Sequence, residues 1–227
     1  MRTRHSLASF DALFRAVGPL LPLLPLGLRV AGGIVAPPTA GGGHTGRAPP
    51  TAAAPPAACL AAYTLVALAR LLLYFAHLLL QRALSGHGAP KGGWLSDHIF
   101  LGASVAACLC VELCCCVADG RACLAPGATE GISNSSGATP HAATMVQHPA
   151  ATPASSPLRA GLVAAAGVAA AALYAALCAD MYYTCRFFHA PTESVAALAM
   201  GLLAFQGPLL TWLERAHARM GAGAVLA

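Results

Sequence analysis

The chain has 227 residues, of which 57% are hydrophobic and only 9% are charged, with a formal net charge of +5. Soluble domains carry about 25% charged residues, so this composition and the long apolar runs exclude an ordinary soluble protein and indicate a membrane protein. The basic residues are scattered and form no positively charged stripe, which leaves a role in nucleic-acid binding without support.

Residues 1–36 combine a basic flank with a poor first span. The apolar stretch 17–35 is interrupted by Arg29 and three prolines, which are Pro19, Pro22 and Pro25. We expect a first transmembrane span here, and a cleaved presequence is the alternative. Residues 37–56 are of low complexity and lack the apolar surface needed to fold, so we expect a linker.

Residues 57–227 are expected to form a transmembrane helical domain. At a rise of about 1.5 Å per residue, four apolar runs are long enough to cross a hydrocarbon core of about 30 Å. These predicted spans cover about residues 57–80, 98–118, 158–179 and 192–213. The predicted fold class is therefore all-α: a polytopic integral membrane helical bundle with four or five transmembrane helices.

Local signals refine this domain. Ser96 and Asp97 are good helix-capping residues and predict the start of the span that follows them. Pro208 predicts a kink in the last span. The polar residues 119–157 are predicted to be a disordered loop, and they include Asn134 in a glycosylation triplet.

Nine cysteines do not indicate a disulfide framework in this chain. Five lie within one apolar run, where a thiol behaves as a small hydrophobic group. These are Cys108, Cys110, Cys114, Cys115 and Cys116. Cys110 and Cys114 are one helical turn apart but lack further ligands at suitable spacing, so we expect no metal and no other cofactor.

Two histidines mark a candidate site. If the last three spans all cross the membrane, His98 and His189 lie on the same face, each at the N-terminal end of a helix. Helix N-termini present free N–H groups and a partial positive charge, which favour phosphate. The two histidines therefore form a candidate phosphate site.

Neighbours of His189 support the same chemistry. Glu193 is four residues later, on the same helix face, and a carboxylate there can fix the imidazole tautomer. Arg186 can bind phosphate through its planar, permanently charged guanidinium. The alternative is that Thr192 and Glu193 cap the helix while Arg186 and His189 reach to lipid headgroups.

Two further charges lie deep in the predicted spans. Glu112 is about 21 Å from His98 along its helix, and Arg70 is about 15 Å from the same membrane face. A charge at such depth is costly unless it is paired. We expect a structural Arg70–Glu112 pair that takes no part in catalysis.

Two blocks of the chain, WLSDHIFLGASVAACLCVEL (Trp94–Leu113) and FFHAPTESVAALAMGLL (Phe187–Leu203), resemble two motifs of the type-2 phosphatidic acid phosphatase superfamily. The first block resembles the Ser-Gly-His segment of that superfamily, and the second resembles its His-x-Pro-x-Asp segment. The matching positions are Ser96, Asp97, His98, His189, Pro191, Glu193, Ala197 and Gly201. Within the superfamily, the chain looks most similar to the fat-storage-inducing transmembrane proteins.

The resemblance implies a lipid phosphatase or diphosphatase of the endoplasmic reticulum, acting in lipid metabolism or lipid storage on a phosphorylated acyl lipid. In the implied mechanism His189 is the nucleophile, Glu193 orients it and His98 is the general acid. Arg186 and Ser96 would bind the substrate phosphate. Asp97 stands where the superfamily has glycine, and this favours the alternative of a non-catalytic multi-pass membrane protein with a structural or lipid-binding role.

Overall fold

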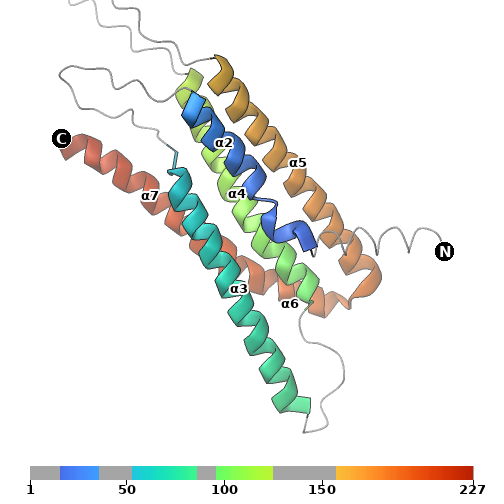
Figure 1. Cartoon of the computed structure of the whole chain (residues 1–227). Helices are drawn as coiled ribbons and strands as arrows, with labels where there is room; N and C mark the ends of the chain where they lie inside the picture. The colour runs from blue at the N-terminus through green and yellow to red at the C-terminus, as the bar shows by residue number, and fades with distance from the viewer. Residues whose placement is uncertain (1–15, 36–52, 86–95, 125–156, 227) are drawn as a thin grey trace, which may run out of the picture.

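The computed structural model of the chain describes residues 16–35, 53–85, 96–124 and 157–226. These residues form helices and contain no strand. The elements in chain order are η1 (Gly18–Leu20), α2 (Leu23–Val35), α3 (Pro56–Ser85), α4 (Asp97–Leu124), α5 (Pro157–Phe188), α6 (Pro191–Gly201), η2 (Leu202–Gln206) and α7 (Gly207–Leu226). Figure 1 shows them as one elongated helical bundle.

Five stretches of these helices are long and apolar enough to cross a membrane. They are Gly18–Val35, Pro56–Ala83, Asp97–Leu124, Pro157–Phe188 and Pro191–Ala218. The prediction of an all-α integral membrane bundle is therefore confirmed, with the larger of the two expected span counts.

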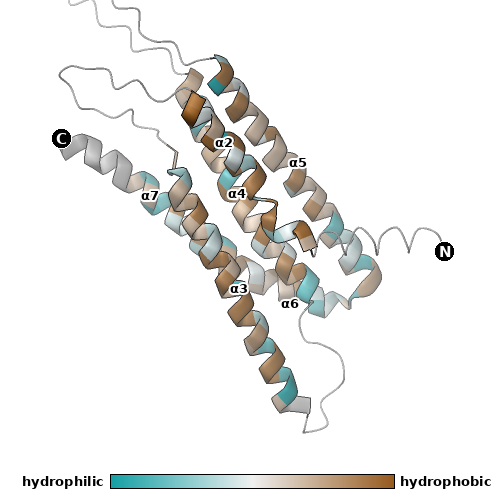
Figure 2. Cartoon of the chain, in the orientation of Figure 1, coloured by the Kyte–Doolittle hydropathy of each residue, from teal (hydrophilic) through white to brown (hydrophobic). Residues whose placement is uncertain are grey.

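Helix α4 is the centre of the bundle. Within its most apolar 18 residues 83% are buried, against 22% for the corresponding windows of α3 and α5. Helix α5 packs along α4, and α2 lies against both of them (Figure 1). The outer helices expose large apolar side chains such as Leu72, Leu203 and Val168, and Figure 2 shows that apolar residues run along their length. Lipid tails accept such a surface, whereas water would not.

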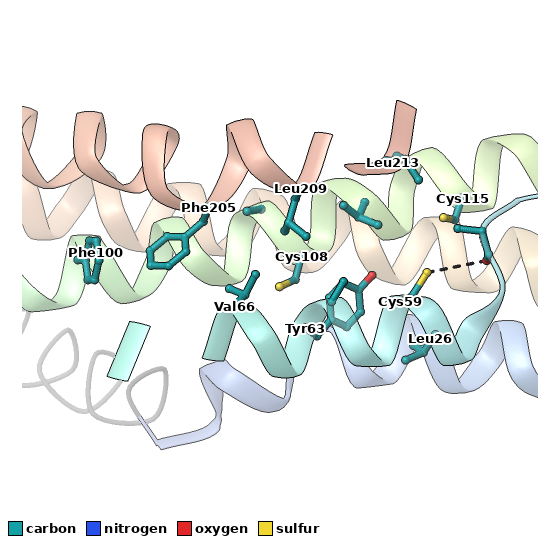
Figure 3. Close-up of a cluster of buried hydrophobic side chains, with 14 residues drawn as sticks. Leu26, Cys59, Tyr63, Val66, Phe100, Cys108, Cys115, Phe205, Leu209 and Leu213 are labelled. Carbon is teal, nitrogen blue, oxygen red and sulfur yellow. Dashed lines mark hydrogen bonds between the residues drawn. The ribbon is translucent and has the colours of Figure 1, made fainter. Parts of the chain in front are cut away.

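One cluster of buried side chains connects α2, α3, α4 and α7 (Figure 3). Leu26 comes from α2, and Tyr63 comes from α3. The rings of Phe100 from α4 and Phe205 from η2 pack with their centroids 5.0 Å apart. These contacts hold the last helical segment, η2 and α7, against α4 at the centre of the bundle.

The prolines of the first span do not prevent a helix. Pro19 lies in the 3₁₀ turn, Pro22 precedes α2 and Pro25 lies in its first turn. Backbone N–H groups in a first helical turn have no partner within the helix, so a proline costs little there. Residues 1–15, to which the presequence alternative also refers, lie outside the described part of the chain.

The helices extend beyond the predicted spans. Helix α4 continues to Leu124 and α5 begins at Pro157, so the expectation of a loop from 119 is wrong for residues 119–124. The rest of that loop, with Asn134, and linker residues 37–52 lie outside the described residues. Linker residues 53–56 are described, and Ala54 is buried in the core.

The kink predicted at Pro208 coincides with a π-helical turn immediately before this proline. Residues Leu202–Gln206 are π-helical, and the N–H of Gly207 bonds to the carbonyl of Leu202. Proline has no N–H to donate and crowds the preceding turn, which accounts for a change of helical register at this position.

Candidate functional site

Three helix ends meet at one end of the bundle, which we call the histidine end. Helix α4 begins there, α5 ends there and α6 begins there (Figure 1). Gly102 near the start of α4 faces Met181 near the end of α5, and Ala103 faces Gly201 of α6. His98 and His189 therefore lie at the same end of the bundle, as the count of spans predicts.

His189 and Glu193 form a pair on the outer part of this end. His189 Nδ1 lies 3.3 Å from Glu193 Oε2, and the two side chains are 25% and 28% exposed. When Nδ1 carries the proton, its N–H donates to the carboxylate, and Nε2 keeps a lone pair available for attack. The predicted pairing is present, and both groups remain open to a ligand.

The capping alternative for this segment finds little support in the geometry. Helix α6 has Ala190 at its N-cap position and Pro191 at its first position, and no side chain caps it. Glu193 turns back to His189 and leaves the helix end uncapped. A proline at the first position needs no hydrogen-bond partner, which reduces the demand for a cap.

Arg186 lies exposed in the last turn of α5, three residues before His189. Its Nη1 donates to the hydroxyl of Tyr182 at 3.3 Å, and its guanidinium lies 5.9 Å from the ring centre of Phe187. Among the described residues no carboxylate forms an ion pair with it. Its positive charge is thus available for an anion beside His189.

His98 has a different environment. Its side chain is 3% exposed, and Nε2 lies 2.6 Å from Asp180 Oδ2 on α5. Helix α6, which begins two residues after His189, reaches α4 where Gly201 faces Ala103, five residues after His98. The structure brings the two histidines to one end of the bundle, where His98 is buried and His189 is partly exposed.

Ser96 and Asp97 have separate roles at the start of α4. The hydroxyl of Ser96 is buried and accepts the backbone N–H of Ile99 at 3.4 Å, so Ser96 caps the helix as predicted. The hydroxyl of Ser96 is thus engaged by the helix end, and its predicted binding of the substrate phosphate stays a prediction. Asp97 is exposed in the first turn of the helix.

Asp180 is the site residue that the sequence analysis missed. It follows directly after the predicted end of its span, and a carboxylate so close to an apolar run is a signal for function or pairing. Its partner is 82 positions away, so the pairing depends on how α4 and α5 align.

The expected Arg70–Glu112 pair is wrong, because Glu112 has other partners. Arg29 Nη1 donates to Glu112 Oε2 at 2.9 Å, and the Tyr63 hydroxyl donates to Oε1 at 2.6 Å. Arg29 also donates through Nε to Asp119 at 3.0 Å. Arg70 is seven residues, or about 10 Å, further along α3 than Tyr63, which places it at a different level.

No group of three or more potential metal ligands gathers within the described part of the chain. Comparisons of the chain with models of protein families, with curated proteins and with solved structures find no match.

Proposed function

We propose that this protein is a membrane hydrolase that removes phosphate from a phosphorylated acyl lipid, acting in the endoplasmic reticulum in lipid metabolism or storage. The observation that carries the proposal is the His189–Glu193 pair, with its ring nitrogen 3.3 Å from the carboxylate, beside Arg186, which forms no ion pair with a carboxylate of the described residues. The resemblance of the two sequence blocks to lipid phosphatase motifs supports the same chemistry.

In the proposed reaction, His189 Nε2 attacks phosphorus and the bond from phosphorus to the leaving oxygen breaks. Glu193 accepts the Nδ1–H bond and stabilises the positive charge that develops on the ring. Arg186 binds the non-bridging phosphate oxygens. Water then attacks the phosphohistidine, which releases inorganic phosphate and restores the free ring.

The proposed role of His98 is to supply the proton that the leaving oxygen requires. Asp180 stabilises the protonated ring through the 2.6 Å contact. This role requires that the substrate's leaving oxygen reaches the ring of His98, which is buried while His189 is partly exposed. A purely structural role for the His98–Asp180 pair is the competing explanation. Substrates whose leaving groups do and do not need a proton distinguish the catalytic role from the structural one.

The test is phosphate release by the purified full chain in detergent, with phosphatidate and an acyl lipid diphosphate as substrates. His189→Ala should lower the rate by on the order of 100-fold or more, because the nucleophile is lost. His98→Ala should cause a similar loss on these substrates but little loss on a lipid nitrophenyl phosphate, whose leaving group needs no proton. Equal losses on both substrates, together with a lower unfolding temperature, would assign His98 to structure alone.

A non-catalytic role is the second candidate, and a specific observation favours it. The exposed carboxylate of Asp97 adds a negative charge at the start of α4, where it would repel an approaching phosphate. On the catalytic proposal, Asp97→Gly keeps or raises activity. If the wild-type chain releases no phosphate from any phosphorylated lipid and Asp97→Gly restores none, the non-catalytic role stands.

A further inference from the structure

Two cavities follow the same side of α3. The near cavity, of about 210 Å³, lies between α3, the start of α4 and the end of α6, and it includes Asp97 and Met200 in its lining. The far cavity, of about 410 Å³, lies between α3 and the segment η2–α7, and it includes Leu65 and Trp212. The near cavity adjoins the histidine end, and the far cavity lies deeper in the bundle.

One line of residues on α3 connects the cavities. At about 100° per residue, Leu65, Ala69 and Ala76 fall within about 20° of a common line along the helix. Leu65 and Ala69 line the far cavity, and Ala76 lines the near cavity. The stretch from Ala58 to Leu80 that borders them is about 33 Å long.

The walls of these cavities change character along this line. The far cavity is lined only by apolar side chains, five of which are alanines. The near cavity has three side chains with polar groups, Tyr74 and His77 on α3 and Asp97 on α4. A molecule with one polar end and a long apolar tail matches this order of polar and apolar walls.

The position of the cavities limits what can enter them. Both border the membrane-crossing stretch Pro56–Ala83, whose outer face exposes leucines. Molecules that arrive there come from the hydrocarbon layer, where acyl chains are the abundant species. A straight acyl chain can lie against the alanine-rich wall of the far cavity.

We propose that these two cavities bind one long acyl chain of a membrane lipid, with the polar end at His77 and Asp97 and the chain end beside Trp212. The direction assigned to the acyl chain rests on the proposed function, which requires the polar end of the lipid to point to His189. Binding of the chain itself requires no hydrolysis.

The test uses two monoacylglycerol probes with a photoreactive diazirine, one near the ester and one at the chain terminus, on the full chain in detergent. Illumination releases nitrogen, and the resulting carbene inserts into a neighbouring bond. Adducts of the first probe should map to the near cavity, around Leu80 and Met200. Adducts of the second should map to the far cavity, around Leu65 and Trp212. Excess unlabelled monoacylglycerol should reduce both severalfold.

Alanine-to-phenylalanine variants provide the matched comparison. Ala61→Phe fills the far cavity and should lower labelling by the terminal probe at least fivefold, while Ala76→Phe should lower labelling by both probes. Ala172→Phe, on an exposed part of α5 outside both cavities, should change neither. The labelling of Ala172→Phe also shows whether an added aromatic ring disturbs the fold.

Labelling that spreads over the exposed face of α5, or that unlabelled lipid does not reduce, would overturn the proposal. The proposal would also be overturned if the protein were a dimer whose far cavity the probes do not label, and if Ala61→Phe converted that dimer to a monomer. A second copy of the chain, and not a lipid, would then fill the far cavity. If the two probes label the near and the far cavity as expected but no phosphate is released, the acyl-chain site stands and the hydrolase is refuted. If phosphate is released but the probes do not label the two cavities in this way, the hydrolase stands and the acyl-chain site is refuted.

Discussion

Glu112 is fully buried, and each of its carboxylate oxygens has its own donor. Removal of one member of a buried ion pair leaves the other without compensation, at a cost of about 3–5 kcal/mol. We therefore expect Arg29→Leu to lower the free energy of unfolding in detergent by about that amount. Denaturant titration followed by circular dichroism measures it.

Arg70 provides the matched control for this substitution, since it is also an arginine in a membrane-crossing helix. Arg70→Leu should change the free energy of unfolding by less than about 0.5 kcal/mol, because Glu112 keeps its partners. The double variant of Arg29→Leu and Glu112→Leu should recover much of the loss. A double variant that loses the sum of the two single effects would show that the pair does not stabilise the protein.

The residue contacts differ in how far the sequence could predict them. The His189–Glu193 contact was predicted from a separation of four residues on one helix, and it forms although His189 lies two residues before α6 begins. The partner of Glu112 is not, because depth along a helix does not determine which neighbouring helix faces it. The His98–Asp180 contact depends in the same way on the alignment of two helices.

At the scale of elements, α4 and α6 approach closely where Gly201 faces Ala103. A Cβ added at Gly201 would overlap the Cβ of Ala103, and neither atom belongs to a flexible side chain. Gly201→Ala should therefore destabilise the protein by about 1–3 kcal/mol, as overpacking does. The variant that combines it with Ala103→Gly should recover most of this loss in thermal unfolding.

Gly161 on α5 serves as the control glycine, because a Cβ added there would contact nothing within 4 Å. Gly161→Ala should be neutral or stabilising, by up to about 1 kcal/mol, since alanine is the better helix former. If Gly201→Ala is equally harmless, α6 does not pack on α4 as described, and the arrangement of the histidine end is incorrect.

The helices were predictable from apolar run length, but their ends were not. Hydropathy marks the part of a helix within the hydrocarbon layer, whereas backbone hydrogen bonds continue into the headgroup region. Residues 119–124 are polar enough to suggest a loop, yet they continue α4, and Asp119 bonds to Arg29. In the sequence, the charge of Arg29 argued against a helix in the first span. Its ion pairs with Glu112 and Asp119 explain why this helix tolerates the charge.

At the scale of the whole molecule, the order of spans determines which side chains share a membrane face. Cys185 near the end of α5 and a cysteine introduced by Asp97→Cys should both react with an impermeant maleimide from the same side. Cys123, at the opposite end of α4, should react only from the other side. Mass spectrometry of proteoliposomes labelled from one side reads all three positions, and Cys185→Ser identifies its peptide.

Labelling of Asp97→Cys and Cys185 from opposite sides would contradict the bundle and separate the histidines. The number of spans could be predicted only as four or five, because the proline-rich first stretch is a marginal span by composition alone. The packing of this first span against α4 and α5, with Arg29 bonded to Glu112, could not be predicted from the sequence. It depends on contacts between segments that are far apart in the chain.

The most direct test of the central claim is to identify the atom that receives the phosphoryl group. The purified chain is mixed with phosphorylated lipid, quenched within the first turnover, digested at high pH and read by mass spectrometry. The account predicts phosphohistidine at His189, absent in His189→Ala and formed more slowly in Glu193→Gln. Phosphate release with no adduct at His189, or with the adduct on another residue, would contradict it.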